Sequence, residues 1–316
     1  MKKKHRFRNL LIAFIVILLV VAGVLYWMVE KAYSKLHYEA APAYTGEHMR
    51  KEGVTNILLI GNDSRENGED GRSDAMILFS ISDKTGTIHM TSLLRDMYVE
   101  IPGHDGNRLN AAYAYGGPEL LMQTVEKNLD IDVHRYVLVN FEAFANLVDA
   151  VGGVELELSK EEIEYVNGFL WEYNQLLDRP EGTDYMDTSA GGVVHLNGPQ
   201  ALAYSRNRFI GTDFGRTERQ RKVIAQVLKR LPVAVIKSPK QLVNGLMPNL
   251  TTNLTVSECF LLCLEAGKLP VYDIVQGSIP LAGTYQDANI RGMSVLEVDW
   301  EVNRKWLQES IYGKNE

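Results

Sequence analysis

The pattern of apolar and polar residues divides the chain into an apolar N-terminal stretch and a longer region of alternating strand-like and helix-like patterns. Leu10 to Val29 runs 20 residues without a charged side chain. At about 1.5 Å per residue a helix of this length crosses a bilayer core of about 30 Å. Tyr26 and Trp27 lie at its far end, where an interfacial aromatic belt is expected. The pattern predicts one N-terminal transmembrane helix.

Basic residues before this stretch indicate its orientation. Residues 1–9 carry five Lys and Arg, and such clusters stay on the cytoplasmic side of a membrane. A cleaved signal peptide is the alternative, although its apolar region usually measures about 7–15 residues. We predict a cytoplasmic basic tail at 1–9, a single-pass cell-membrane anchor at 10–29, a stalk at 30–53 and an extracytoplasmic domain at 54–316.

Three apolar runs at the start of the domain predict neighbouring strands. Val54–Ile60 has the pattern of a buried strand. Met76–Ser82 and Thr87–Leu94 flank the sequence Asp83-Lys84-Thr85-Gly86, which is typical of a hairpin turn. An antiparallel hairpin places the start of its first strand beside the end of its second. Residues just before 76 and just after 94 should therefore lie at one end of the sheet.

The remaining elements alternate between helices and strands. We predict helices at about 118–129, 141–150, 213–231, 239–247, 256–267 and 300–311, and further strands at 136–140 and 154–158. Residues 159–190 are polar and irregular, and we expect a flexible insertion there. The alternation predicts an α/β layered domain with a core at 54–232 and a helical part at 233–316.

The segment from Tyr204 to Lys222 concentrates basic residues in an acidic chain. After residue 30 the chain carries 28 Lys and Arg against 39 Asp and Glu, so a bound anion must be attracted by a local cluster. A helix is predicted to start near Asp213 as its N-cap, and Arg216 and Gln220 then share a face. A helix N-terminus with guanidinium groups favours a phosphate. A solvated, salt-bridged helix face is the alternative.

Two carboxylates and two arginines are predicted to meet at the sheet end that the hairpin defines. Asp63 follows the first strand, Arg72 and Asp74 precede the second, and Arg95 follows the third. They converge if the first strand pairs antiparallel to the second. Carboxylates placed to meet arginines and a phosphate usually do so through a hard divalent cation such as Mg²⁺. Salt bridges between loop residues are the alternative.

Cysteine usage excludes one class of protein. Cys259 and Cys263 are the only two cysteines, so an exported domain of this size is not a disulfide scaffold. Their spacing within an apolar run predicts buried positions on a helix.

Several motifs, in this order within residues 54–232, resemble the LytR-CpsA-Psr family. They are Asp63-Ser64-Arg65, Gly71-Arg72-Ser73-Asp74, Arg95-Asp96, Leu109-Asn110-Ala111-Ala112-Tyr113, Tyr204-Ser205-Arg206-Asn207-Arg208 and Asp213-Phe214-Gly215-Arg216-Thr217-Glu218-Arg219-Gln220. The resemblance implies an α/β fold built as a three-layer α-β-α sandwich with a mixed central sheet, and an apolar tunnel for a lipid tail. The chain departs from the family at Leu94, where members usually have a proline.

The resemblance also implies roles for individual residues. Asp63 and Asp74 correspond to carboxylates associated with Mg²⁺ (or Mn²⁺). The side chains that correspond to pyrophosphate contacts are Arg72, Arg95, Arg206, Arg208, Arg216, Arg219 and Gln220. The catalytic candidates are Asp63, Asp74, Arg95 and Asp213. The residues that either line the tunnel or belong to the core are Val125, Leu129, Phe144, Leu147 and Val227.

Members of this family are membrane-anchored enzymes of Gram-positive cell envelopes that move glycopolymers from polyprenyl-pyrophosphate carriers to peptidoglycan. The resemblance therefore implies a phosphotransferase that attaches teichoic acid, capsule or a related polysaccharide through a phosphodiester link. No nucleic acid partner is expected, because the basic cluster would lie across the membrane from the chromosome. Hydrolysis of the same pyrophosphate is one alternative. A non-catalytic, membrane-anchored sensor or transcription attenuator that binds lipid-linked anions is the other.

Overall fold

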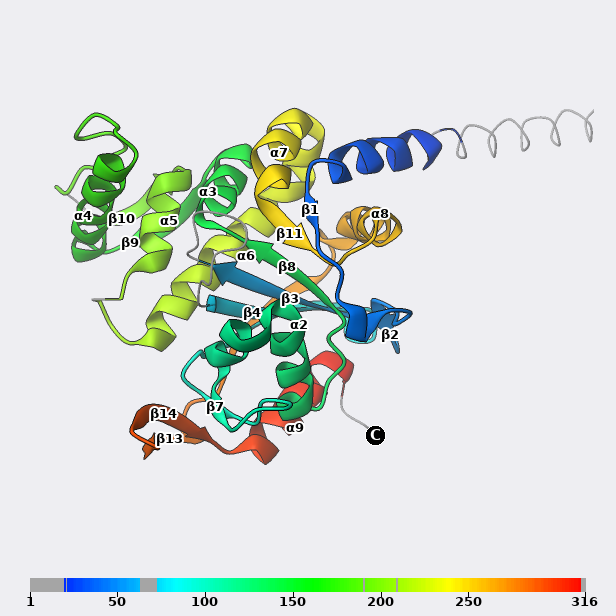
Figure 1. The fold of residues 1–316 in the computed structure, drawn as a ribbon. Coiled ribbons are helices and arrows are strands. Elements are labelled where there is room, and N and C mark those ends of the chain that lie inside the picture. The colour runs from blue at the N-terminus through cyan, green and yellow to red at the C-terminus, as the bar shows by residue number, and fades with distance from the viewer. Residues whose placement is uncertain (1–19, 21, 63–72, 190, 209, 314–316) are drawn as a thin grey trace, which may run out of the picture.

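A mixed eight-stranded sheet forms the centre of the computed structural model, which describes residues 20, 22–62, 73–189, 191–208 and 210–313 (Figure 1). The strands run in the order β1 (His37–Tyr38), β11 (Leu250–Thr252), β8 (Arg135–Val139), β3 (Val54–Asn62), β4 (Ser73–Ser82), β5 (Thr87–Leu93) and β12 (Asp273–Ile279), with β2 (Arg50–Lys51) paired to β3. Strands β3, β4 and β5 are antiparallel, whereas β8 is parallel to β3 and β12 is parallel to β5. The predicted α/β fold with a mixed central sheet is confirmed.

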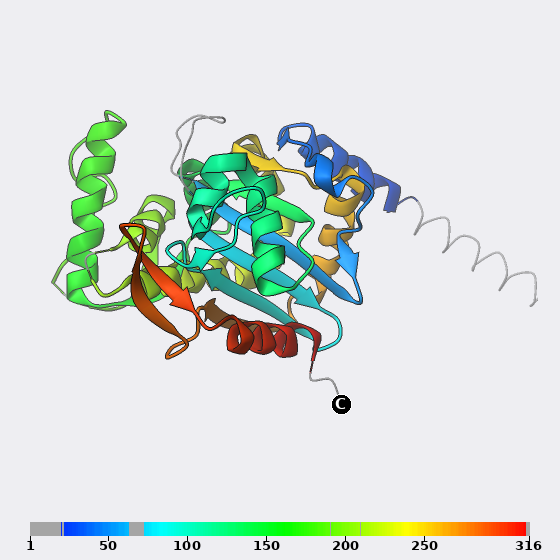
Figure 2. The ribbon, with the colours of Figure 1, turned by 60° about the horizontal axis from the view of Figure 1, so that its bottom comes forward.

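Helices lie on both faces of this sheet, as Figures 1 and 2 show. Their bounds are α2 (Leu109–Leu129), α3 (Phe141–Ala150), α4 (Lys160–Leu176), α5 (Gly198–Arg206), α6 (Asp213–Lys237), α7 (Pro239–Leu246), α8 (Val256–Glu265) and α9 (Trp300–Tyr312), with 3-10 turns η1 (Pro42–Tyr44), η2 (Met247–Asn249) and η3 (Ala266–Lys268). Three two-stranded antiparallel sheets complete the described fold: β6 (Tyr98–Val99) with β7 (Asn107–Arg108), β9 (Val154–Leu158) with β10 (Gly192–Leu196), and β13 (Tyr285–Ile290) with β14 (Met293–Val298).

Successive residues of the central strands are buried on opposite faces of the sheet. Leu58 and Leu78 lie in one core with residues of α2 and α9. Their neighbours Leu59 and Ile77 point the other way, towards the side covered by α3, α6 and α8. Successive strand residues face opposite sides of a sheet, so strands that are apolar at every position are buried on both.

The strand pairing determines which strand ends lie close together. Ser82 pairs with Thr87 across the predicted hairpin turn, and Asn62 at the end of β3 lies opposite Ser73 at the start of β4. The first two strands therefore have the antiparallel pairing on which the predicted convergence depends. The end of β3, the start of β4 and the end of β5 lie at one end of the sheet.

Residues 160–176 form helix α4, and the prediction of an irregular insertion there is wrong. Ser159 accepts a hydrogen bond from the backbone of Glu162, whose side chain in turn accepts one from the backbone of Ser159. This capping box satisfies two backbone donors at the start of the helix. Ile163, Val166 and Leu170 are buried against β9, β10 and α5. The apolar spacing was present in the sequence but was outweighed by the many polar residues around it.

Much of the predicted stalk at 30–53 is part of the domain. β1 pairs with β11 and β2 pairs with β3, so most of residues 37–51 cannot act as a free spacer. Long-range pairing of two-residue strands leaves no periodic signal in the sequence, which explains the wrong prediction.

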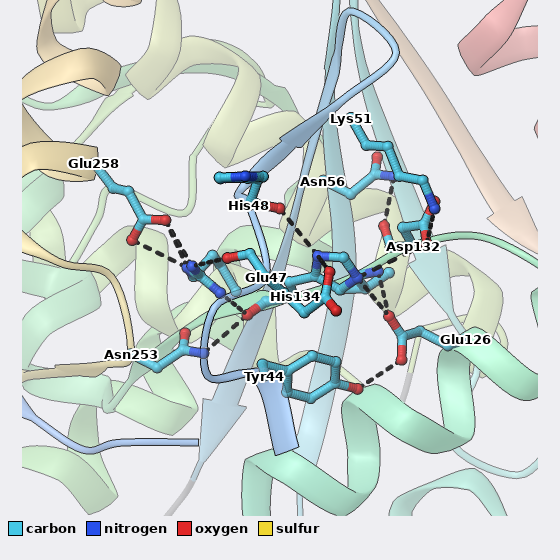
Figure 3. A network of polar contacts seen from close by, with 12 residues as sticks. Tyr44, Glu47, His48, Lys51, Asn56, Glu126, Asp132, His134, Asn253 and Glu258 are labelled. Atoms are coloured by element: carbon cyan, nitrogen blue, oxygen red, sulfur yellow. Dashed lines mark hydrogen bonds and ion pairs between the residues drawn. The ribbon is translucent and has the colours of Figure 1, made fainter. Parts of the chain in front are cut away.

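Side-chain contacts reinforce this attachment (Figure 3). The hydroxyl of Tyr44 donates to Glu126 on α2 at 2.6 Å. The guanidinium of Arg135 donates to the backbone oxygen of Glu47 at 2.7 Å and is paired with Glu258 on α8. The N-terminal segment is thus tied to α2, β8 and α8 together.

The structure describes only part of the predicted N-terminal anchor, and the C-terminal part differs from expectation. Residues 22–33 are helical, and within the described residues no helix is both long and apolar enough to traverse a bilayer. The predicted tail at 1–9 and residues 10–19 and 21 of the predicted anchor at 10–29 lie outside those residues, so the anchor stays a prediction. The C-terminal part, expected to be helical, also supplies β11 and β12 to the main sheet.

The two cysteines lie on α8, as the predicted helix requires, but the prediction that both are buried is wrong. Cys259 is half-buried and Cys263 is exposed, and both are free thiols. One side of α8 faces the interior of the protein, and neither cysteine lies fully on that side.

Candidate anion site and apolar cavity

A cavity of about 420 Å³ lies between the sheet and helices α3, α5, α6 and α8. Its walls are almost wholly apolar. Leu59 and Ile77 line it from the sheet, and Ile224 and Leu228 line it from α6. Of the predicted tunnel residues, Phe144, Leu147 and Val227 do line this cavity. Val125 and Leu129 do not, because they lie on α2 in the core on the opposite face of the sheet.

Charged and polar side chains line the cavity in two places, at α8 and η3 with Glu265 and Lys268, and at α5 and α6. Arg206, at the end of α5, and Gln220, on α6, line the second of these places. The guanidinium carbon of Arg206 lies 4.0 Å from the ring centroid of Phe141 and 5.0 Å from that of Phe169, an arrangement that holds a cation over aromatic faces. Gly61 and Ala75 are the sheet residues nearest the ends of β3 and β4 that line the same cavity. Arg221, the residue after Gln220, donates to Ser92 near the end of β5, so the part of the cavity lined by Gln220 lies near the sheet end where β3 and β4 meet.

The first turn of α6 places the predicted anion-binding residues. Thr212 occupies the N-cap position and Asp213 is the first helical residue, so the helix starts one residue earlier than the predicted N-cap at Asp213 requires. Arg216 is only 3% exposed, and its Nη2 lies 2.9 Å from Oδ1 of Asp213. The predicted shared face of Arg216 and Gln220 is directed into the protein, because Gln220 lines the cavity and Arg216 is buried. Asp213 is therefore placed to hold the guanidinium of Arg216.

Arg219 is buried on a different side of α6. Its Nε donates to Glu162 of α4 at 2.8 Å, and its Nη2 donates to the backbone oxygen of Ile210 at 2.8 Å. These bonds hold together α4, the loop before α6 and α6 itself. In this arrangement Arg219 supports the site rather than lining the cavity.

Arg221 is a residue whose importance sequence reasoning missed. It is 7% exposed, and its Nη1 donates to Ser92 at 2.6 Å near the end of β5. No carboxylate of the described residues forms an ion pair with it, and burial lowers the pKa of its guanidinium. A buried positive charge that forms no ion pair with the described carboxylates adds to the positive potential of this region. The i, i+4 spacing from Thr217, whose hydroxyl it also contacts, was the available signal.

A second pair of arginines flanks Asp96. Nε of Arg95 lies 3.6 Å from one carboxylate oxygen of Asp96, and Nη1 of Arg108 lies 3.5 Å from the other. Arg95 follows β5 directly, as predicted, and so lies at the sheet end described above. Arg108 was not predicted as a site residue, although it precedes one of the quoted motifs.

The remaining predicted residues are placed only in part. Asp63 and Arg72 lie outside the described residues, and Asp74 is described through its backbone in β4 alone. Arg208 is exposed, two residues after the end of α5. In the described part of the chain no group of three or more His, Cys, Asp or Glu is arranged to hold a metal ion.

Comparison with known proteins places the chain in a family. The model of the LytR_cpsA_psr family matches residues 25–309, and the chain therefore belongs to the LytR-CpsA-Psr family, as its motifs predicted. It is 31% identical over 309 residues to the polyisoprenyl-teichoic acid–peptidoglycan teichoic acid transferase TagU of Enterococcus faecalis. That match covers 93% of this chain and 92% of the relative.

Solved structures share the fold. TagT bound to LI-WTA superposes with a TM-score of 0.65 at 26% identity, over 84% of this chain and 95% of TagT. The LytR-CPS2A-psr family protein YwtF (TagT) with bound octaprenyl pyrophosphate lipid superposes with a TM-score of 0.61 at 25% identity, again over 84% and 95% of the two chains.

Proposed function

We propose that the protein transfers a glycopolymer, such as teichoic acid or a capsule polysaccharide, from a polyprenyl-pyrophosphate carrier to peptidoglycan. The observation that carries this proposal is a single, almost wholly apolar cavity that is also lined by Arg206 and Gln220. This shape suits a ligand with a long apolar tail and an anionic head. A relative that binds octaprenyl pyrophosphate and another named as a teichoic acid transferase support the same reading.

The proposed reaction is a phosphoryl-type transfer. A hydroxyl oxygen of the peptidoglycan acceptor attacks the phosphorus atom that bears the glycopolymer, and the bond from that phosphorus to the bridging oxygen breaks. A phosphodiester forms and polyprenyl phosphate leaves. The residues Arg95, Arg206 and Arg216 neutralise the charge that develops on the leaving phosphate, with the N-terminal end of α6 adding its dipole. The acceptor proton passes to a carboxylate, for which Asp63 and Asp74 are the candidates.

A divalent cation, Mg²⁺ or Mn²⁺, belongs to this proposal at Asp63 and Asp74. Asn62 pairs with Ser73, so the chain leaves β3 and enters β4 at one place, which suits two converging carboxylates. Carboxylate oxygens are the ligands that Mg²⁺ prefers. The ion would neutralise phosphate charge when bound.

The proposed location is the outer side of a cell membrane of the Gram-positive type. Support comes from the uncharged stretch Leu10–Val29 with basic residues before it. Such an anchor would hold the cavity near the bilayer in which a polyprenyl donor resides.

Product analysis with the full-length protein tests the function. The protein is incubated with a polyprenyl-pyrophosphate-linked glycan and Mg²⁺, with and without peptidoglycan. We expect glycan-bearing peptidoglycan and release of polyprenyl phosphate only when the acceptor is present. Equal release without acceptor would identify a hydrolase. An unchanged donor in both reactions would identify a non-catalytic binder, and either result would overturn the proposal.

A further inference from the structure

Helix α8 is apolar on two sides, which is unusual for a helix at the edge of a soluble domain. Leu262, with Ala266 and Leu269 just beyond the helix, lines the cavity. Leu261 and Leu264 face outward and are 50% and 52% exposed. Val271, after η3, is 78% exposed. We call Leu261, Leu264 and Val271 the α8 face.

The α8 face lies at the end of the cavity away from Arg206. Glu258 of α8 is paired with Arg135, which lies beside Ile57 near the start of β3, whereas α6 contacts the opposite end of the sheet through Arg221 and Ser92. In Figures 1 and 2, α8 and the group formed by α4, β9 and β10 lie at opposite ends of the molecule. The cavity therefore extends from the anion site to a wall whose outer surface is this apolar face.

Charged side chains on α8 are turned away from the face and neutralised. Glu258 is paired with Arg135 at 2.7 Å, and Glu265 is paired with Arg50 at 2.5 Å. Residues 259–264, Cys-Phe-Leu-Leu-Cys-Leu, carry no charge. An apolar environment on this side would thus bury no unpaired charge of the helix.

The N-terminal helix lies beside the α8 face. The ring of Tyr26 packs edge-on against that of Phe260 with centroids 5.4 Å apart, and the hydroxyl of Tyr33 donates to the backbone of Leu254 at 2.9 Å. The uncharged stretch Leu10–Val29 thus ends against α8. Because the pairing of β1 with β11 starts at residue 37, little free chain separates that stretch from the domain.

We propose that the α8 face is a bilayer-contacting surface, and that the apolar tail of the ligand passes between the bilayer and the cavity beside α8. The occupant is a lipid surface because the uncharged stretch ends beside the face, and because the amphipathic residues at this junction, Tyr26, Trp27 and Lys31, are those typical of a membrane interface. Lys31 lies with its Nζ 5.3 Å from the ring centroid of Trp27. The proposal rests on the proposed function for the identity of the tail and on the proposed anchor for the direction of the membrane.

Spin-label accessibility in the full-length protein tests the surface. Single cysteines are introduced as Leu264→Cys on the α8 face and Val193→Cys on β10, which is 74% exposed, in a Cys259→Ser, Cys263→Ser background. The labelled proteins are placed in nanodiscs of phosphatidylcholine and phosphatidylglycerol. We expect the label at 264 to be open to oxygen and shielded from a water-soluble nickel chelate, and the label at 193 to show the reverse. Equal nickel access at both positions would overturn the proposal.

A second experiment keeps the native cysteines and does not depend on glycopolymer transfer. Octaprenyl pyrophosphate is offered to the full-length Leu264→Asp variant either from phosphatidylcholine vesicles or from detergent micelles, with Val193→Asp as the matched control. We expect Leu264→Asp to load more slowly from vesicles alone. Loading that is unchanged from vesicles, or slowed equally from both sources, would contradict the proposal. Transfer activity lost while label depth and vesicle loading behave as expected would instead count against the proposed function only.

Discussion

Nε of Arg219 lies 2.8 Å from Oε1 of Glu162, and this bond joins helix α6 to helix α4. The same Glu162 caps α4 through its other carboxylate oxygen, which accepts from the backbone of Ser159 at 3.1 Å. A helix that the sequence did not predict therefore holds an arginine that the sequence assigned to pyrophosphate. The structure gives Arg219 a positioning role behind Arg216 and Gln220.

Breaking this ion pair should destabilise the fold. Glu162→Gln leaves the guanidinium of Arg219 buried without its carboxylate, and the free energy of unfolding should fall by about 3 kcal/mol. Chemical denaturation of the full-length protein in detergent measures the change. Glu218→Gln is the matched control, because the Glu218–Lys222 pair lies on the exposed side of α6 and should cost under about 1 kcal/mol. Equal losses in the two variants would contradict the assignment.

Arg221 should matter more for binding than for stability. Arg221→Met replaces a buried charge that has no carboxylate partner among the described residues by an apolar side chain of similar length. The unfolding free energy should change by no more than about 1 kcal/mol. Affinity for a pyrophosphate head should fall about tenfold as a positive charge is lost from a poorly hydrated region.

Titration with octaprenyl pyrophosphate measures this affinity, with Lys229→Met on the exposed side of the same helix as control. A large loss of stability with unchanged affinity would show that the guanidinium of Arg221 serves packing alone.

Filling the cavity should shorten the tail that it accepts. Leu228 lines the cavity from α6 and is only partly buried. The larger side chain of Leu228→Trp therefore occupies space in the cavity and does not overpack a core. Binding of octaprenyl pyrophosphate should weaken while binding of a farnesyl pyrophosphate changes little. Calorimetric titration with both ligands checks this. Parallel losses for the long and short tails would indicate that the tail lies elsewhere.

Glu126 should make stability depend on pH. Burial raises the pKa of its carboxyl, and hydrogen bonds from Tyr44 and Val133 offset this only in part (Figure 3). The folded protein binds this proton more tightly than the unfolded chain. The contribution of this proton to the free energy of unfolding is therefore complete below the ordinary carboxyl pKa. It is lost as pH rises through the folded-state pKa of Glu126.

The variant Glu126→Gln removes this titration. Its stability relative to wild type should increase as pH rises from about 4 to 7, as measured by denaturation at several pH values. Glu100→Gln, on the exposed surface, serves as control and should run parallel to wild type. A Glu126→Gln curve that also runs parallel would contradict the prediction.

The sequence predicted the elements whose signals are local. The turn Asp83–Gly86 and the apolar runs beside it fixed the hairpin and, through it, the sheet end at which Arg95 lies. Helical spacing placed Arg216 and Gln220 on one inward face of α6. These inferences need only neighbouring residues, because turn chemistry and helical period act over a few positions.

What the sequence did not predict depends on contacts between distant residues. β1 and β11 are short strands that pair across more than 200 positions, and neither carries a pattern of its own. Leu59 and Ile77 line a cavity whereas Leu58 and Leu78 fill a core. The two sets look alike in sequence, because apolar residues are required on both faces of the sheet. What distinguishes the two faces is whether the covering helices pack directly on the sheet or leave a cavity.

Binding of octaprenyl pyrophosphate to the full-length protein with Mg²⁺ tests the central claim most directly. Wild type is compared with Arg216→Ala at the buried start of α6 and with Lys222→Ala on its exposed side, after circular dichroism has shown that all three are folded. The account predicts that Arg216→Ala loses most of its affinity and that Lys222→Ala binds like wild type. Undiminished binding by Arg216→Ala would mean that the pyrophosphate does not lie at the N-terminal end of α6.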